Sequence, residues 1–288
     1  MTAQIAFIGF GEAARAFTGA STWTAACRAY DRLVDTDATR AGLEAACETH
    51  SVTCGATLDD ALTSAEAAIS VVTADQALTA AINATQYLHD GTLYLDFNSV
   101  APDTKRAAAQ KIDGCGAHYV DVAVMSPVLP KRLSTPLLVS GPQADPAVTL
   151  LRSAGFTDVR SVGTEVGRAS AIKMIRSIMV KGREALSACC ALAAHQAGVM
   201  DEIRASLGDE WAEQADYNLD RMLTHGKRRA AEMDEVAAML TAMSINPLLA
   251  SATASWQRTL GENPPAHLPD TLDEKLDLIA QANKAAAE

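Results

Sequence analysis

The first strong pattern in the chain is QIAFIGFGEAA, which runs from Gln4 to Ala14. An apolar run ends at Gly9, a G-x-G-x-x-A pattern follows, and a helix-forming run begins at Glu12. The first glycine permits a tight turn, Gly11 lets a phosphate approach the backbone, and Ala14 lets the helix pack closely on the strand. The first turn of such a helix offers N–H groups and a partial positive charge to phosphates. The pattern therefore predicts a dinucleotide-binding βαβ unit.

An acidic residue in the expected place supports this interpretation. Asp31 follows Gly11 by twenty positions and ends the next expected strand, where its carboxylate can bind the adenine-ribose hydroxyls. That carboxylate would repel a 2′-phosphate and so favours NAD, whereas the neighbouring Arg32 keeps NADP open as the alternative. An ordinary solvated turn is the other interpretation of this pair. The residues predicted to bind the cofactor are Gly9, Phe10, Gly11, Glu12, Ala13, Ala14, Asp31, Arg32, Thr73 and Asn98.

Short β-rich runs alternate with helical stretches up to residue 163. Strands are expected at 4–9, 26–30, 68–72, 92–97, 119–124, 136–140 and 159–162, and helices at 12–20, 36–49, 75–88, 102–111 and 146–154. Apolar strands that alternate with helices indicate a parallel sheet covered on both faces. We therefore expect an α/β domain of the Rossmann type over residues 1–163.

The pattern changes after residue 163. No strand signal follows; a long helical run covers about 165–198, and further helices are expected at 200–243, 248–259 and 270–286, the last with Asp270 as its N-cap. The sequence thus predicts that the long helix joins the α/β domain to an all-α substrate and dimerisation domain over residues 164–288.

Composition limits the functions that this chain can have. Its 288 residues are 49% hydrophobic, which suits two domains, and its net charge of −11 opposes nucleic-acid binding. The cysteines and histidines lack metal-ligand spacing, the N-terminus lacks a basic signal-peptide region, and no run of 18 apolar residues occurs. We expect a cytoplasmic protein with no metal and with neither a nucleic-acid nor a membrane partner.

Four segments resemble the β-hydroxyacid dehydrogenase and 6-phosphogluconate dehydrogenase family. They are the pattern at 4–14, YLDFNSVAP at 94–102, YVDVAVMSPV at 119–128 and GTEVGRASAIK at 163–173. More narrowly, the whole chain is similar to a bacterial branch whose helical C-terminal domain has unknown function. The resemblance implies an NAD(P)-dependent oxidoreductase acting on a small hydroxy acid or related polar alcohol, and a homodimer formed through the helical domain.

The resemblance also assigns residues. It implies that Lys173 is the acid/base, that Asn98 and Ser99 lie near the nicotinamide ribose, and that the loop of Met125, Ser126 and Pro127 grips the substrate carboxylate.

Two positions depart from the family pattern. The loop lacks the family's Ser-Gly-Gly, and Ser177 replaces an asparagine four residues after the lysine. Both changes concern the substrate, so an imine or keto reductase and a non-catalytic dinucleotide-binding regulator remain alternatives.

Helical spacing extends this assignment along the long helix. Lys173, Ser177 and Lys181 recur every four residues and so share one helix face, which is expected to line the cleft between domains. A desolvated lysine can have its pKa lowered enough to accept a hydroxyl proton. Ser177 could hydrogen-bond the substrate, and Lys181 could anchor its carboxylate. Gly167 is expected to spare this cleft a side chain. The simpler interpretation is that these lysines are solvated.

A second polar cluster occurs further along the chain. Arg221, His225 and Arg228 share one helix face, and Arg228 meets Glu232 at a spacing of four. One interpretation is a charged surface with local ion pairs. The other is that His225 and Arg228 complete the substrate site.

Overall fold

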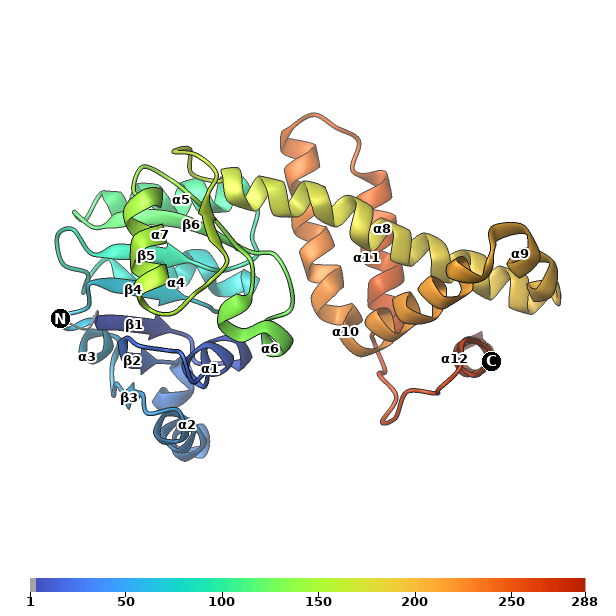
Figure 1. Cartoon of the computed structure of the whole chain (residues 1–288), viewed down its shortest axis with the longest axis horizontal. Coiled ribbons are helices and arrows are strands. Elements are labelled where there is room, and N and C mark those ends of the chain that lie inside the picture. The colour runs from blue at the N-terminus through green and yellow to red at the C-terminus, as the bar shows by residue number, and fades with distance from the viewer. Residues whose placement is uncertain (1–3, 288) are drawn as a thin grey trace. The chain divides into compact units, whose positions relative to one another are not determined.

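The computed structural model describes residues 4–287, and it separates into two compact units. The first unit ends at Lys173 and the second begins at Met174, both within helix α8 (Arg168–Ala197) (Figure 1). The division therefore falls inside the long helix, beyond the boundary expected at residue 163. Among the described residues, no helix has the length and apolar character needed to cross a membrane.

The first unit is built on one sheet. Within residues 4–287 the strands form an eight-stranded sheet in the order β3-β2-β1-β4-β5-β6-β7-β8. Their bounds are β1 (Gln4–Ile8), β2 (Ala26–Tyr30), β3 (Thr53–Cys54), β4 (Ala67–Ser70), β5 (Leu93–Asp96), β6 (His118–Val124), β7 (Leu137–Ser140) and β8 (Val159–Ser161). The predicted α/β fold of the Rossmann type is confirmed, and the order β3-β2-β1-β4-β5-β6 is the one found in Rossmann sheets.

One pairing differs from the expected parallel sheet. Strands β6 and β7 pair antiparallel, whereas the other neighbours pair parallel. The connection between them holds only the short helices α6 (Val128–Lys131) and η3 (Arg132–Ser134). A parallel crossover normally needs a longer helix lying on the sheet, so this chain turns back instead.

Helices cover both faces of the sheet. They are α1 (Glu12–Thr18), η1 (Arg32–Asp35), α2 (Asp37–Thr49), α3 (Leu58–Leu62), η2 (Ala74–Gln76), α4 (Ala77–Ala84), α5 (Pro102–Asp113) and α7 (Ala144–Ser153). Neighbouring β1 residues enter different cores: Phe7 belongs to the cluster that includes Phe17, and Ile8 belongs to the cluster that includes Ile112. The expectation missed β3, α3 and α6 because segments this short carry little periodicity.

The second unit is helical throughout its described residues. Beyond α8 it contains α9 (Met200–Leu207), α10 (Asp209–Ala242), α11 (Leu248–Leu260) and α12 (Leu272–Ala287). The single helix expected over 200–243 is wrong, because Gly208 adopts a φ of +88° and separates α9 from α10. The N-cap expected at Asp270 is wrong too: the Thr271 hydroxyl accepts a bond from the Glu274 N–H at 3.3 Å.

Candidate functional site

The glycine-rich turn after β1 has the geometry of a phosphate-binding loop. Gly9 has a φ of +89°, and a Cβ there would lie 2.5 Å from the carbonyl oxygen of Val71, so the turn requires glycine. A Cβ at Gly11 would meet nothing within 4 Å, and this residue gives α1 no side-chain cap. The start of α1 therefore keeps N–H groups and open space for a phosphate. Ala14 is fully buried, in the core cluster that also contains Phe7 and Phe10.

Asp31 joins this turn to the end of β2. Its Oδ2 accepts the backbone N–H of Phe10 at 2.9 Å, and its Oδ1 accepts that of Leu33 at 3.0 Å. The carboxylate thus shapes the glycine-rich turn before any ligand binds. Each carboxylate oxygen can accept a further bond, so these contacts are compatible with the predicted ribose contact.

Two more of the residues predicted to bind the cofactor, Arg32 and Thr73, act on the carboxylate of Asp75. Hydrogen bonds from Gln76 and then Thr73 lower the pKa of Asp75, and the positive charge of Arg32 adds a smaller effect. Thr73 is therefore a hydrogen-bonding neighbour of Asp75, whereas Arg32 acts on it through charge alone; both residues are exposed. Of the predicted residues in α1, Glu12 is exposed and Ala13 is half-buried.

Asn98 holds the chain at the carboxyl ends of β4 and β5. Its Oδ1 accepts the N–H of Val72 at 2.7 Å, and its Nδ2 donates to the Ser70 hydroxyl at 3.0 Å. The residue is 4% exposed. In this structure Asn98 links two strand ends, and its contact with a cofactor stays a prediction.

Lys173 and Ser99 meet although 74 positions separate them. The Lys173 ammonium, on the second turn of α8, donates a hydrogen bond to the hydroxyl of Ser99, which follows β5. Both residues are half-buried. The contact brings an amine and a hydroxyl together just beyond the strand end, where α/β proteins bind their ligands.

Gly167 lies just before α8 for a reason other than the expected one. Its φ is +91°, and a Cβ there would lie 2.9 Å from the Arg106 Nη1 atom and 3.0 Å from the Pro102 Cβ. The expectation that this glycine keeps a ligand cleft open is therefore corrected. It lets the chain before α8 pack closely against the first turns of α5.

The predicted substrate loop forms the turn between β6 and α6. Met125 donates its N–H to the Pro136 carbonyl at 2.9 Å, Ser126 is half-buried and Pro127 is exposed. The Ser126 hydroxyl makes a long 3.4 Å bond to the carbonyl of Pro127. With the Met125 N–H used within the turn and no N–H on Pro127, this loop has fewer backbone donors than a Ser-Gly-Gly loop.

In the second unit, Ser177 and Lys181 form a buried polar group. The Lys181 ammonium donates to the Ser177 hydroxyl at 3.0 Å and pairs with the Glu232 carboxylate of α10 at 2.8 Å. Glu232 thus offsets the charge that was predicted to anchor a substrate carboxylate. The sequence pattern paired Glu232 with Arg228 on the same helix and did not predict its ion pair with Lys181 of α8. His225 is half-buried and Arg228 is exposed on α10.

A second buried ion pair escaped the sequence analysis. Arg229 is 7% exposed, and its Nε donates to Glu184 at 3.1 Å, with further bonds from its Nη2. The side-chain amide of Gln257 donates to the same carboxylate at 2.8 Å. Three helices, α8, α10 and α11, are therefore joined at one carboxylate.

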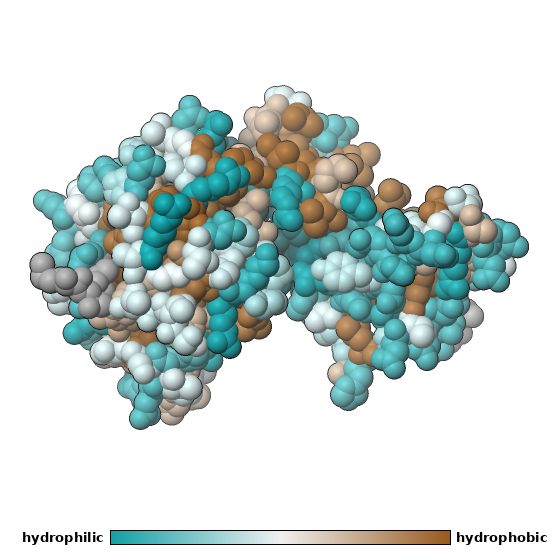
Figure 2. All heavy atoms as spheres, viewed as in Figure 1, coloured by the Kyte–Doolittle hydropathy of each residue, from teal (hydrophilic) through white to brown (hydrophobic). Residues whose placement is uncertain are grey.

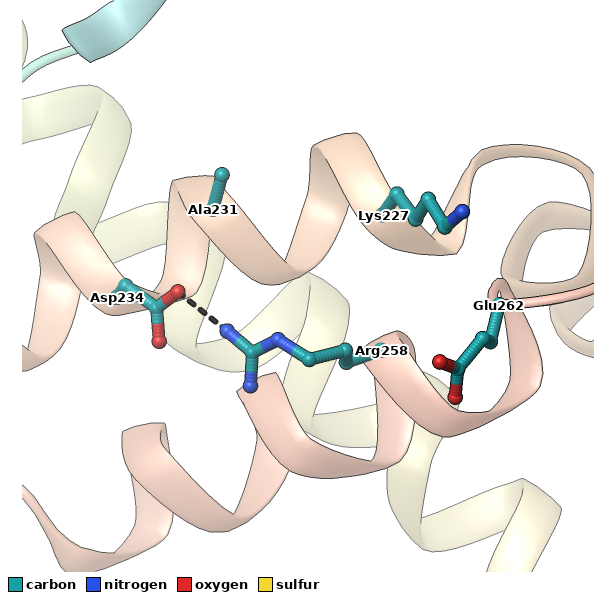
Figure 3. A pocket seen from close by; sticks show the side chains of 5 residues that line it. All are labelled: Lys227, Ala231, Asp234, Arg258 and Glu262. Atoms are coloured by element: carbon teal, nitrogen blue, oxygen red, sulfur yellow. Dashed lines mark hydrogen bonds and ion pairs between the residues drawn. The ribbon is translucent and has the colours of Figure 1, made fainter.

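A shallow cavity of about 340 Å³ lies between α10 and α11 (Figure 3). It is lined by Lys227, Ala231, Asp234, Arg258 and Glu262. The Arg258 guanidinium bonds to the Asp234 carboxylate at 2.6 Å across it. The two positive and two negative side chains balance each other, so the cavity does not select an anion. Neither His225 nor Arg228 lines it.

The fold and its glycine-rich turn define an α/β dinucleotide-binding protein with a helical second unit. Residues 4–148 match the NAD binding domain of 6-phosphogluconate dehydrogenase, and residues 194–260 match a domain of unknown function, DUF1932. The chain belongs to this 6-phosphogluconate dehydrogenase-type NAD-binding family, and its cofactor class is a nicotinamide dinucleotide. The resemblance drawn from the four sequence segments is confirmed.

Solved structures of similar fold match nearly the whole chain. A conserved hypothetical protein from Sinorhizobium meliloti is 32% identical, with a TM-score of 0.79 over 98% of this chain and 97% of its own. A conserved protein of unknown function, described as structurally similar to 3-hydroxyacid dehydrogenases, is 29% identical, with a TM-score of 0.70 over 90% and 97%. The 3-hydroxyisobutyrate dehydrogenase of Mycobacterium tuberculosis shares the fold, with 16% identity and a TM-score of 0.73 over 97% and 99%.

Proposed function

We propose that this protein is an NAD(P)-dependent dehydrogenase that oxidises a small hydroxy acid or related polar alcohol, with Lys173 as the acid/base. The contact between the Lys173 ammonium and the Ser99 hydroxyl carries the proposal. The NAD-binding family of residues 4–148 supports the redox class. Two 3-hydroxyisobutyrate dehydrogenases that share the fold suggest the substrate class.

The residues of this chain have distinct tasks in such a reaction. A nicotinamide dinucleotide held at the glycine-rich turn and Asp31 would supply the acceptor for the hydride of the carbinol carbon. Lys173, in its neutral form, takes the hydroxyl proton, and in the reverse direction its ammonium returns that proton to the forming alkoxide. Ser99, hydrogen-bonded to the same amine, orients it toward the substrate oxygen. Ser126 and the residues beside it hold the substrate carboxylate.

A dehydrogenase screen tests the proposal. The purified chain is incubated with NAD or NADP and with 3-hydroxyisobutyrate, L-serine, other 3-hydroxy acids, and their aryl and amino variants, and absorbance at the wavelength of the reduced nicotinamide is followed. We expect turnover on at least one hydroxy acid. Reduction of imines or ketones without oxidation of any hydroxy acid would identify the reductase alternative. Cofactor binding without any turnover would identify a regulator.

We further propose that NAD is preferred over NADP, because the negative charge of Asp31 would repel a 2′-phosphate. Asp31→Ser should weaken NAD binding by about 10- to 100-fold, the value of a lost charged hydrogen bond, and should shift preference toward NADP. Binding constants for both cofactors measure this. Asp37→Ser, at an exposed position on α2, is the control. A wild-type protein that prefers NADP would show that Arg32 dominates instead.

We propose a homodimer formed through the helical unit. Hydrophobic surface gathers near the connection between α10 and α11 (Figure 2), where Met243, Ile245, Leu248 and Leu249 are 49–70% exposed. Leu248→Glu should convert the dimer to a monomer in light scattering, because a charge would be buried in the interface. Leu207→Glu, at an exposed position of α9, should leave the dimer intact. A wild-type monomer at micromolar concentration would remove this proposal.

We also place the protein in the cytoplasm, where reducing conditions suit its six free thiols. Fractionation of cells that produce the tagged chain would test this, and recovery in an extracellular or membrane fraction would contradict it.

A further inference from the structure

A row of buried polar side chains crosses four neighbouring strands of the first unit. The pairing register places Ser70, Asp96, Asp121 and Ser140 side by side on β4, β5, β6 and β7. None is more than 1% exposed. Buried polar groups are tolerated when their hydrogen bonds are satisfied, and they then hold one arrangement of the surrounding chain. The mechanism described above uses none of these side chains.

One buried ammonium joins the two carboxylates of this row. Lys105 of α5 is 0% exposed, and its Nζ donates to the Asp96 carbonyl at 2.7 Å. The same atom lies 3.1 Å from the Asp96 Oδ1 and 3.4 Å from the Asp121 Oδ1. Tyr119 donates its hydroxyl to the Asp96 Oδ2 at 2.6 Å. Burial and the negative charge of Asp96 raise the pKa of Tyr119, so the phenol remains protonated and continues to donate.

Asp96 holds the segment that carries Ser99. Its Oδ1 accepts the backbone N–H of Asn98 at 2.9 Å, one residue before Ser99. The turn after β5 is therefore tied to the carboxylate, and through it to Lys105. This bond limits how far the Ser99 hydroxyl can move.

Asp121 holds the first turn of α8, which leads to Lys173. Its Oδ2 accepts the N–H of Ser170 at 3.0 Å, and its Oδ1 accepts the Ser170 hydroxyl at 2.6 Å. The Ser140 hydroxyl also donates to Asp121 and accepts the N–H of Ala169 at 3.0 Å. These bonds satisfy N–H groups that a helix start leaves without an intrahelical partner. They fix the start of α8 directly before Lys173.

We propose that Lys105 is a positioning residue: by bridging Asp96 and Asp121 it holds the Ser99 turn and the start of α8 at one separation, so that Lys173 meets Ser99. Being fully buried, Lys105 acts through these two carboxylates and not on a ligand. The catalytic effect of Lys105 rests on the proposed function. Its effect on the position of the Lys173 side chain does not depend on that function.

The first experiment needs no substrate. The rate of Lys173 acetylation by acetic anhydride is measured against pH by peptide mass spectrometry, in the full-length chain. Variants are Lys105→Met, Ser170→Ala, and the control Lys111→Met, which makes the same substitution at an exposed position of α5. In the first two variants we expect faster acetylation of Lys173 and a changed pH profile, because the amine is no longer held against the Ser99 hydroxyl and is open to water. The control should coincide with wild type.

The second experiment uses a hydroxy acid that the wild type oxidises. Lys105→Met and Ser170→Ala should lower kcat by about 10- to 100-fold with little change in KM, the usual effect of misplacing a reacting group. If Lys105→Met does not fold, as judged by circular dichroism, the Ser170→Ala variant provides the test. It removes a single hydroxyl group that binds Asp121 and leaves the buried charges in place.

The two experiments separate the proposals. Titration profiles of both variants that coincide with wild type would overturn the positioning role, even in an active dehydrogenase. Shifted profiles in a protein that oxidises none of the tested compounds would support the positioning role and contradict the proposed function.

Discussion

Lys173→Met should lower turnover by about 10²- to 10⁴-fold, the usual contribution of general acid–base catalysis. Methionine keeps much of the length and volume of the side chain but can neither accept a proton nor donate one to Ser99. Dinucleotide affinity should stay close to that of wild type, because the glycine-rich turn belongs to other elements of the first unit. Steady-state kinetics and cofactor titration measure the two effects separately.

Lys227→Met, at an exposed position of α10, is the matched control and should keep full activity. A Lys173→Met variant with near wild-type turnover would reject the acid/base assignment. His225 or a bound water would then be the next candidate for the base.

The largest expected change in stability comes from the buried ion pair of the second unit. Arg229→Met should lower the free energy of unfolding by about 3–5 kcal/mol, because Glu184 would be left as a buried charge without its guanidinium partner. Urea denaturation followed by circular dichroism measures this. The transition assigned to the helical unit should shift if the two units unfold separately.

Arg258→Met makes the same substitution in an ion pair whose side chains are 53% and 54% exposed. Water already solvates these charges, so we expect at most about 1 kcal/mol of destabilisation. Equal losses in the two variants would show that burial does not determine the value of the Arg229–Glu184 pair.

Most of the fold of the first unit could be predicted from local pattern. Strand β2 has the expected bounds, and the other expected strands differ by one or two residues at one or both ends, because alternation and apolar runs depend on neighbours in sequence. The antiparallel pairing of β6 with β7 could not be predicted this way. It depends on how the connecting segment crosses the sheet, which a local pattern does not record.

The candidate site shows the same division. The turn at Gly9 and the carboxylate of Asp31 have a recognisable spacing, since both act on the backbone close to them. The contact between Lys173 and Ser99 was harder to predict from the sequence, because Ser99 follows a different element, 74 positions away. The burial of Lys105 had no signal of its own in the sequence, because the surrounding segment, PDTKRAAAQK, is typical of a solvated helix. Its partners gave a weak one: Asp96 and Asp121 are acidic residues within the otherwise apolar runs of β5 and β6, and a buried carboxylate needs a partner.

Sequence pattern was therefore sufficient for the family, the glycine-rich turn and the order of the main elements, because these follow from backbone propensity and short-range spacing. Only the tertiary structure showed which charged side chains pair with each other. Lys181 binds Glu232 of another helix, and Arg229 binds Glu184 across 45 positions. A charge binds whichever opposite charge the packing brings within about 4 Å, and burial determines how strongly the two interact.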